Sequence, residues 1–590
     1  MSTPNQAPVI VVGGSLVGLA SALFLSAHSV PVILVERHMA SSPHPRAIGY
    51  TPRTLELLES VGISASSLRA AKPVSWPRRI KVQSLAGEWK DELHWNSSSN
   101  NNTKPNGGPK GGPNGGPNGG NPPAPPGGPP SDGAKVHSPH ISAIITQDRL
   151  ESILRRRAVE LGADLRLGWK MTSWTQSADG VSVTAVNEQG GEQTTLEGSY
   201  MVACDGARSA VREQLGIRTT GVGHLGSLRS IMFRCAPVEH YLDRGFVQFA
   251  IEGRDDGFEA FLMSYLDGRW ALMWNTDNDK DNDNDNDNKT DTVDAQRALV
   301  RKALGVGVDV VRDEDIEVVA VGQWDMSAGI AERFSCGRVF LAGDAAHTLP
   351  PNRGGYGANT GFGDAHNLAW KVAAVRSGAA ADASSMLATY DEERRPVALV
   401  RHDQLLVRDD FKPYVRRGGG ECSATGRVVE VLDDVAMELG QIYRSAGVVL
   451  GVEREGEGLP DAMRPDEWRG QPGTRAPHVA MVRRGTGEAI SSLALFGRGG
   501  WVLLSRDGVW RGVADGAGTL VGVACGFVCV GEDVVEADEG ETFEDMFGVG
   551  ASGAVLVRPD GIIAWRSAGR GAGFEDEFSD VFGKVTFARG

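Results

Sequence analysis

The feature that constrains the fold most is the stretch from Val9 to Glu36, which reads VIVVGGSLVGLASALFLSAHSVPVILVE. A short β-branched run is followed by glycines, then by an apolar segment with helical spacing, and then by a second apolar run. Glycine is needed where a strand turns sharply into a helix, because a side chain would block the close approach of the backbone. The pattern predicts a strand–helix–strand unit within a parallel sheet.

The glycines of this unit fit a nucleotide-binding turn. Gly13 and Gly18 occupy the first and third positions of the dinucleotide fingerprint, and Ser15 stands at the second, where glycine is usual. The following helix offers unpaired N–H groups and a partial positive charge to a pyrophosphate. Glu36 lies about 20 residues on, where a carboxylate accepts hydrogen bonds from the adenosine ribose, and we place Arg37 in the same site. The unit predicts a bound dinucleotide and leaves FAD and NAD both open.

Composition restricts the class of protein. A chain of 590 residues is too long for one hydrophobic core and predicts two to four domains. A net charge of −15 argues against nucleic-acid and anionic-membrane partners. Six scattered cysteines fit a reducing compartment, and no apolar stretch reaches the roughly 20 residues of a membrane span. We therefore expect a soluble cytoplasmic protein.

Two segments of low complexity interrupt the chain. Residues 96–133 are rich in glycine, proline and asparagine, and residues 275–291 consist mostly of aspartate and asparagine. Neither contains enough apolar surface to offset the entropy of ordering. Both are predicted to be expanded surface loops.

Two later motifs place an acidic residue directly after an apolar run. In YMVACDGARSAVREQLG, Asp205 and Gly206 follow a predicted strand and precede the start of a helix. In RVFLAGDAAHTLPP, Gly343 and Asp344 do the same. The glycine-rich segment that follows contains Pro351, Gly354, Gly355, Gly357 and Asn359.

Together the three motifs resemble the class A flavoprotein aromatic hydroxylases, which have the p-hydroxybenzoate hydroxylase fold. The resemblance implies that Asp205 helps to hold the FAD pyrophosphate region and that Asp344 binds the ribityl chain. It also implies that the glycine-rich segment brings bare backbone against the flavin ring, because glycine leaves no side chain in the way.

Two further stretches are similar to the same family. HPRAIGYTPRTLELLESVG corresponds to the segment that places an arginine, here Arg46, beside the cofactor. ITQDRLESIL places Gln147 where the family has a residue at a helix start near the ribityl chain. Within the family, the chain most resembles the aromatic polyketide hydroxylases of the aklavinone hydroxylase and pentachlorophenol monooxygenase type, including their thioredoxin-like C-terminal domain.

The implied fold is α/β, with a Rossmann-like FAD-binding domain, an interleaved β-sheet substrate domain and a C-terminal thioredoxin-like domain. The expected boundaries are 1–77, 140–220 and 320–415 for the FAD-binding domain, 78–139 and 221–319 for the substrate domain, 416–450 for a linker and 451–590 for the C-terminal domain. The tail lacks two cysteines spaced for thioredoxin chemistry, and Cys525 and Cys529 fall in a strand-like stretch. We expect a redox-inactive structural module, and the sequence leaves open whether it lies in a homodimer interface.

The resemblance implies an FAD-dependent monooxygenase that uses NADPH or NADH and O₂. A hydroperoxide at flavin C4a would hydroxylate a phenolic or polyketide-derived aromatic substrate in secondary metabolism. A Baeyer–Villiger or epoxidising oxygenase, a dehydrogenase or flavin-dependent reductase, and a non-catalytic carrier with a dinucleotide fold are the alternatives. Intact Asp205 and Asp344 argue against the carrier, which would have no need of them.

The catalytic base stays open at this stage. Tyr50, Tyr265, Tyr356 and Arg353 are candidates, and spacing selects none of them. His347 and His366 lack metal-ligand spacing with cysteine or carboxylate partners, so we expect both to be structural and expect no metal site.

Overall fold

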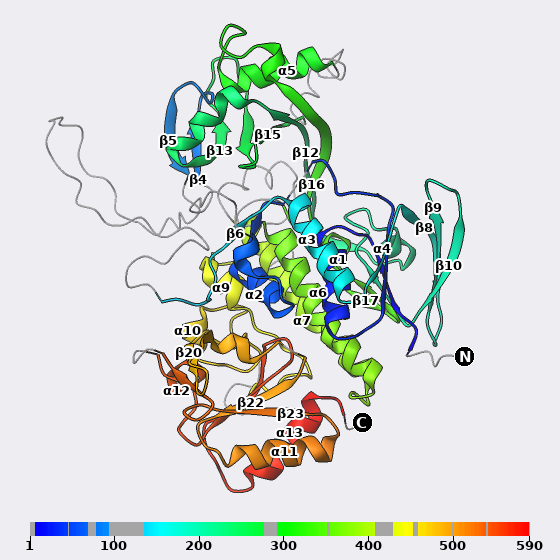
Figure 1. Cartoon of the computed structure of the whole chain (residues 1–590), viewed down its shortest axis with the longest axis vertical. Helices are drawn as coiled ribbons and strands as arrows, with labels where there is room; N and C mark the ends of the chain where they lie inside the picture. The colour runs from blue at the N-terminus through cyan, green and yellow to red at the C-terminus, as the bar shows by residue number, and fades with distance from the viewer. Residues whose placement is uncertain are drawn as a thin grey trace, which may run out of the picture.

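The computed structural model describes residues 6–44, 47–68, 78–93, 135–276, 292–350, 355–407, 429–451, 458–497, 499–537 and 541–588. The molecule is elongated, with an antiparallel sheet at one end, an α/β body in the middle and the C-terminal domain at the other end (Figure 1). No described helix has the length and apolar character that crossing a membrane requires.

A six-stranded sheet forms the middle of the molecule. Its order is β17 (Ser335–Cys336), β18 (Val339–Leu341), β11 (Tyr200–Ala203), β1 (Val9–Val12), β2 (Val32–Glu36) and β7 (Asp164–Leu167). All neighbours pair in parallel except β17 and β18, which are antiparallel. Strand β1 lies at the centre, and its four residues are buried, which explains the continuous apolar run. The strands before the three predicted motifs are therefore neighbours.

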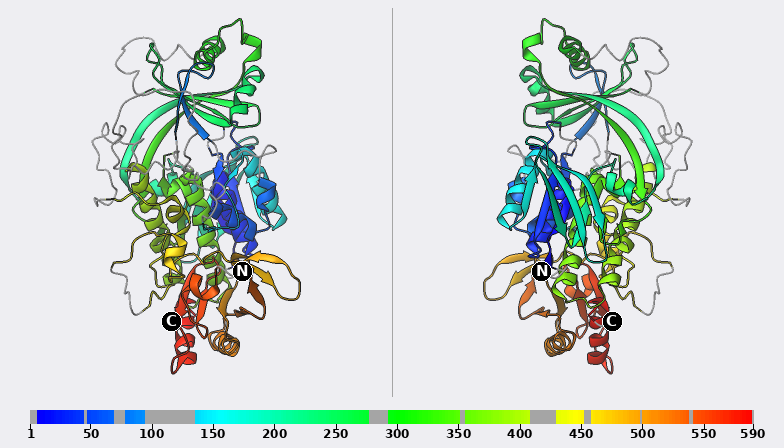
Figure 2. Two further views of the ribbon diagram at one scale, coloured as in Figure 1. Left: turned by 90° about the vertical axis from the view of Figure 1, so that its left-hand side faces the viewer. Right: turned by 90° about the vertical axis from the view of Figure 1, so that its right-hand side faces the viewer.

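Helices cover this sheet. Helix α1 (Leu16–Ala27) packs against α3 (Gln147–Glu160) and against α6 (Tyr356–Ser377), which in turn packs against α7 (Ala383–Leu406) and α2 (Pro52–Ser60). Most of α1 is buried, which is why its sequence is apolar on every face. A separate antiparallel sheet of β8 (Trp169–Gln176), β9 (Val181–Asn187) and β10 (Gln193–Gly198) lies at the side (Figure 2). The arrangement confirms the predicted α/β fold.

The eight-stranded sheet is mostly antiparallel. Its order is β19 (His347–Thr348), β16 (Glu317–Ala331), β12 (Thr219–Arg234), β15 (Arg269–Asn275), β14 (Ala260–Ser264), β13 (Phe246–Ile251), β4 (Arg78–Val82) and β5 (Trp89–Leu93). The long strands β12 and β16 reach from this sheet into the middle of the molecule (Figure 1).

Alternate residues of the sheet face opposite sides. One face packs its aromatic and branched side chains under α5 (Val293–Leu304) and the 3₁₀ helix η3 (Ala236–Arg244). The other face carries Met232, Met263, Tyr265 and Ala271, with Phe261 and Met273 beside them, and it packs against Ile48 of the middle of the molecule. The second face is therefore the one turned toward the parallel sheet.

The C-terminal domain has a thioredoxin-like topology. Strand β22 (Trp501–Ser505) continues through α11 (Trp510–Val521) to the parallel strand β23 (Cys525–Cys529), and a hairpin of β25 (Ala554–Val557) and β26 (Ile563–Ser567) leads into α13 (Phe574–Val585). The strand order is β23-β22-β25-β26. Strands β20 (Ala480–Arg483), β21 (Ala489–Ser491) and β24 (Val534–Glu536) form a small second sheet. Short helices α9 (Asp434–Leu439) and α10 (Pro465–Trp468) precede this domain, α9 within the predicted linker.

The two cysteines of this domain occupy opposite ends of β23. Four residues of extended chain separate their Cα atoms by about 13 Å, roughly twice the span that a disulfide bridges. Burial raises the pKa of Cys525 to about 12, so its thiol stays protonated. This placement supports the prediction of a module without thioredoxin chemistry.

A buried ion pair joins the C-terminal domain to α2. Glu56 accepts from Arg475 Nε at 2.8 Å and Nη2 at 2.5 Å, from Ser138 Oγ at 2.7 Å and from Arg53 Nη1 at 3.0 Å. Burial raises the pKa of Glu56, but Arg475 and Arg53 outweigh burial and bring the pKa down to about 2. The carboxylate therefore stays charged throughout the physiological range.

This pair predicts acid sensitivity. Because the pKa of Glu56 in the folded protein is below its usual value of 4.5, its stabilisation is complete above pH 4.5 and disappears as the pH falls toward 2. The variant Glu56→Gln is expected to lower stability by about 3 kcal/mol at pH 7, and the deficit should shrink below pH 4.5. Thermal unfolding of both proteins between pH 3 and 7 measures the deficit. A deficit that is constant over this range would contradict the assignment.

Candidate flavin site

The three predicted motifs meet at one edge of the parallel sheet. Val12 pairs with Ala203, and Ala203 pairs with Leu341, so the chain leaves β1, β11 and β18 side by side. The backbone stays paired one step beyond: Gly13 N–H donates to Val35, and Ala342 N–H donates to Ala203. The carboxyl edge of a parallel sheet is where α/β folds bind nucleotides.

Two glycines of the first motif are required by close packing. Gly13 has φ +101°, and a Cβ there would lie 2.2 Å from the Cys204 carbonyl oxygen. A Cβ on Gly18 would lie 1.8 Å from the Gly13 carbonyl oxygen. No side chain fits at either position without moving backbone, so the turn passes directly between β1 and β11.

Ser15 replaces the usual second glycine for a visible reason. It is the N-cap residue of α1, and its Oγ donates to Glu151 Oε1 at 2.7 Å and accepts from Gln147 Nε2 at 3.0 Å. Gln147 also donates to Glu151 at 2.9 Å, and Ala47 N–H donates to Gln147 Oε1 at 3.4 Å. Sequence reasoning missed Glu151, which is buried; its position one turn after Gln147 on the same face of α3 is the signal that could have found it.

Glu36 ends β2 beside this turn. Its Oε2 accepts from Gly14 N–H at 2.5 Å, and its Oε1 accepts from His38 N–H at 2.8 Å. The half-buried carboxylate therefore lies beside the glycine turn, at the carboxyl edge of the parallel sheet. Arg37 is exposed and donates from Nε to His38 Nε2 at 3.0 Å.

Asp205 has one occupied and one unoccupied carboxylate oxygen. Oδ2 accepts from Val211 N–H at 3.1 Å at the start of α4 (Ala210–Gln214). Oδ1 is buried and has no hydrogen-bond partner among the described residues. A buried acceptor of this kind is costly unless something donates to it, so it fits a hydroxyl or N–H group of a ligand. Gly206 follows with φ +87°.

The third motif lies on the adjacent strand. Gly343 and Asp344 form a 3₁₀ turn, η6 (Gly343–Ala345), in which Gly343 has φ +60°. Asp344 is half-buried and accepts no hydrogen bond from the described residues. Arg212 links this turn to the second motif, since its Nη1 donates to Ala345 O at 2.9 Å and its Nη2 donates to Ala207 O at 2.8 Å.

The buried carboxylate of Asp364 holds this turn in place from α6. Asp364 of α6 is fully buried; its Oδ2 accepts from Gly343 N–H at 3.2 Å and contacts His347 Nε2 at 2.6 Å, and its Oδ1 accepts from Arg394 Nε at 2.9 Å. Burial raises the pKa of Asp364, but His347 and Arg394 outweigh it and keep the pKa below its usual range. This contact with a buried carboxylate supports a structural role for His347.

The glycine-rich segment is described in part. Arg46, Arg353, Pro351 and Gly354 lie outside the described residues. Gly355 has φ +63° and caps α6, and Gly357 lies in its first turn.

Asn359 belongs to the same turn of α6. Its side chain donates to Gly49 O at 3.2 Å and accepts from Thr54 Oγ1 at 2.6 Å, so it ties α6 to α2. Only the backbone of Asn359 is left for a cofactor.

The eight-stranded sheet presents an apolar wall that contains few polar groups. Methionine is flexible and adapts to irregular shapes, which suits a surface of Met232, Met263 and Met273. The buried Oε1 of Gln248 on β13 and the buried hydroxyl of Tyr50 have no hydrogen-bond partner among the described residues. Burial raises the pKa values of Tyr50 and Tyr265, so both are neutral phenols, able to donate a hydrogen bond to a ligand, and neither is a ready base.

Comparison with known proteins identifies the family. Residues 6–403 match the family described as FAD binding domain, and residues 469–585 match aromatic-ring hydroxylase, C-terminal. The chain belongs to the FAD-dependent aromatic-ring hydroxylases. This confirms the resemblance seen in the three motifs, and the protein is a flavin-dependent monooxygenase.

Relatives of this hydroxylase are similar over nearly the whole chain. It is 37% identical to 4-methyl-5-nitrocatechol 5-monooxygenase of a Burkholderia species, with 95% of this chain and 94% of the relative covered. It is 35% identical to tetracenomycin A2 monooxygenase-dioxygenase of Streptomyces glaucescens, with 96% and 94% covered. A solved ternary complex of aklavinone-11 hydroxylase with FAD and aklavinone matches with a TM-score of 0.78 and 29% identity, covering 98% of this chain and 99% of that one.

Proposed function

We propose that this hydroxylase uses NADPH or NADH and O₂ to add one oxygen atom to a phenolic or polyketide-derived aromatic ring. The observation that supports this most is that Gly13, Asp205 and Asp344 lie together at one sheet edge, while the methionine-rich wall of the other sheet faces the same part of the molecule. The relatives named for nitrocatechol and tetracenomycin, and the complex with aklavinone, support an aromatic substrate.

The residues present fit FAD. Gly13 and Gly18 let the turn pack closely against backbone, and the unpaired backbone N–H groups at the start of α1 would receive a pyrophosphate. We assign Glu36 to the adenosine ribose, the open Oδ1 of Asp205 to the pyrophosphate region and Asp344 to the ribityl hydroxyls. The backbone of Gly355 and Gly357 would lie against the ring, near the positive end of α6. We place Ser15 at the pyrophosphate end and Gln147, which donates to Ser15, near the ribityl chain.

Bound FAD would supply the redox chemistry, accepting electrons from the nicotinamide and activating O₂. The protein has three tasks around it. The apolar wall excludes water and holds the substrate ring against the flavin. The Tyr50 hydroxyl and the Gln248 amide offer the few polar contacts that fix the orientation of a phenol. The first turn of α6 stabilises negative charge near the ring.

A screen for coupled turnover tests the proposal. The purified holoenzyme is mixed with NADPH or NADH and with simple phenols or polycyclic aromatics under ¹⁸O₂. We expect substrate-dependent oxidation of the nicotinamide and a product that carries one labelled oxygen as a hydroxyl group on the aromatic ring. Nicotinamide oxidation without label would indicate a reductase. Insertion of the label beside a carbonyl, or as an epoxide, would indicate the other oxygenases, and protein that never binds flavin would indicate a carrier.

Asp344 provides a direct test of the site. The variant Asp344→Ala is expected to bind FAD about 10- to 100-fold more weakly, because it loses hydrogen bonds from hydroxyls to a charged acceptor. Asp164→Ala is the matched control, since Asp164 begins β7 at the opposite edge of the same sheet. Flavin fluorescence titration gives both affinities, and circular dichroism checks the fold. Equal FAD affinity in the two variants would refute the assignment of Asp344.

We further propose that the protein is cytoplasmic and that it forms a homodimer. All five described cysteines are free thiols, which fits a reducing compartment. A homodimer through the C-terminal domain would be seen by sedimentation.

A further inference from the structure

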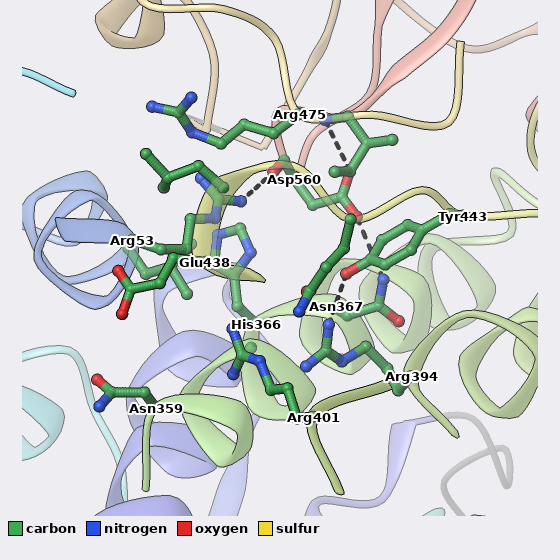
Figure 3. A pocket seen from close by; sticks show the side chains of 15 residues that line it. Arg53, Asn359, His366, Asn367, Arg394, Arg401, Glu438, Tyr443, Arg475 and Asp560 are labelled. Atoms are coloured by element: carbon green, nitrogen blue, oxygen red, sulfur yellow. Dashed lines mark hydrogen bonds between the residues drawn. The ribbon is translucent and has the colours of Figure 1, made fainter. Parts of the chain in front are cut away.

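A small cavity lies where α2, α6, α7 and α9 meet the C-terminal domain (Figure 3). Its volume is about 50 Å³, enough for a few water molecules and too small for a nucleotide or an aromatic substrate. It lies on the side of α6 that faces α2, where the amide of Asn359 bonds to Thr54. The charged side chains that line it are Arg53, Arg394, Arg401, Arg475, Glu438 and Asp560.

Three of the four arginines have carboxylate partners. Arg53 and Arg475 share Glu56, and Arg394 pairs with Asp364. Asp560 is itself occupied by Arg558, at 2.6 Å. Because Glu56, Asp364 and Asp560 already pair with arginines, none of the three is left for the fourth arginine of the cavity.

Arg401 is the arginine without a counterion. It is 4% exposed, its Nη1 donates to Thr360 Oγ1 at 2.7 Å, and its Nε has no hydrogen-bond partner among the described residues. Among the described residues, no carboxylate oxygen lies within 4.0 Å of a guanidinium nitrogen of Arg401, which is the limit for an ion pair. Arg394 lies seven residues earlier on α7, hence on the same face, and Figure 3 shows the two guanidinium groups near each other. Burial and the charge of Arg394 both lower the pKa of Arg401.

Glu438 is a further carboxyl group that lines the same cavity. No ion pair joins it to an arginine among the described residues, although Arg401 lines that cavity as well. Burial raises its pKa to about 8, with Arg401 opposing the rise. At neutral pH the group is therefore mostly protonated, and it leaves the charge of Arg401 uncompensated.

We propose that this cavity binds one small monovalent inorganic anion of the size of chloride, held by Arg401 next to Arg394. A buried guanidinium without a counterion destabilises a protein, and an anion between two neighbouring guanidinium groups supplies that counterion and offsets their repulsion. The open Nη1 of Arg475 offers a further donor from the C-terminal domain. The anion joins α7 to that domain and takes no part in the oxygenation.

Thermal unfolding of the FAD-loaded full chain tests the proposal. In gluconate buffer at constant ionic strength and pH 7, replacing gluconate by chloride or bromide is expected to raise Tm saturably, by about 3 °C or more. Arg401→Gln should abolish the rise, and Arg218→Gln, which changes an arginine with an 84% exposed side chain, should keep it. A rise that is absent in the wild type, or unchanged in Arg401→Gln, overturns the site.

Two measurements keep the test decisive if Arg401→Gln does not fold. A crystal of the unaltered protein soaked in bromide should show anomalous density in the cavity beside Arg401, and water alone at that place overturns the site. In Glu438→Gln the chloride-dependent rise should persist at pH 7 and extend above pH 8, because no carboxylate forms there. A large destabilisation of Glu438→Gln that chloride does not reverse would mean that ionised Glu438 is the counterion, and it would also overturn the site.

Discussion

Asp364→Asn is expected to lower FAD affinity at least tenfold and to destabilise the protein by about 3–5 kcal/mol. The asparagine keeps the shape of the side chain and removes its charge, which leaves Arg394 buried with no carboxylate partner. It also weakens the contact to Gly343 N–H, which positions the turn that carries Asp344. Both effects follow from one buried carboxylate that receives three donors.

Flavin content, FAD titration and thermal unfolding measure these losses. Asp325→Asn is the matched control, because Asp325 is an exposed carboxylate paired with Arg208, and such pairs contribute about 0–1 kcal/mol. If Asp364→Asn unfolds at a lower temperature and yet binds FAD as the wild type does, the group stabilises the fold without positioning the site. If neither property changes, the buried pair is not formed.

Glu393→Gln is expected to loosen the C-terminal domain. Glu393 of α7 is fully buried; its Oε1 accepts from Arg558 Nη1 at 2.6 Å and from Ser445 Oγ at 2.6 Å, and its Oε2 accepts from Lys371 Nζ at 2.7 Å. Arg558 comes from the C-terminal domain, between β25 and β26. Neutralising this carboxylate leaves Asp560, which pairs with Arg558, as the one described carboxylate beside the two cations, at a loss of about 3–5 kcal/mol.

The resulting change is visible as faster proteolysis between residues 408 and 470 and as a lower Tm. Burial lowers the pKa of Lys371 to about 8 even with Glu393 present, so the variant should release the Lys371 proton near neutral pH. Its stability deficit should therefore be smaller at pH 9 than at pH 6. Glu314→Gln, at an exposed pair with Arg312, is the control and should match the wild type. Proteolysis at the wild-type rate would show that the network does not hold the domain.

Local sequence predicted the strand–turn–helix units well. A glycine that must pass between two strands, such as Gly13, and an acidic residue that ends a strand, such as Asp205, leave a pattern within a few residues. The apolar run of β1 indicates a strand buried on both faces, and missing cysteine pairs in the tail indicate a domain without thioredoxin chemistry. Each of these signals depends on neighbours in the chain.

Contacts between segments far apart in the chain could not be predicted from such local patterns. Glu151 looks like an ordinary helix glutamate until α3 packs beside Ser15, 136 residues earlier. Asn359 is predicted to bind the cofactor, and only the folded chain shows that its side chain accepts from Thr54 of α2. Glu56, Asp364 and Glu393 are charged residues that a sequence places on the surface, and each is buried only because arginines from other elements reach it.

The sequence alone therefore determined the parallel sheet, the nucleotide turn and the acidic strand ends, because those features are set by residues within one strand–helix unit. Only the tertiary structure decided which charges lose contact with water, and that choice depends on segments hundreds of residues apart meeting in one place. Arg401, which has no carboxylate partner among the described residues, arises in this second way. Its charge becomes costly only when the surrounding elements have excluded the water that would otherwise hydrate it.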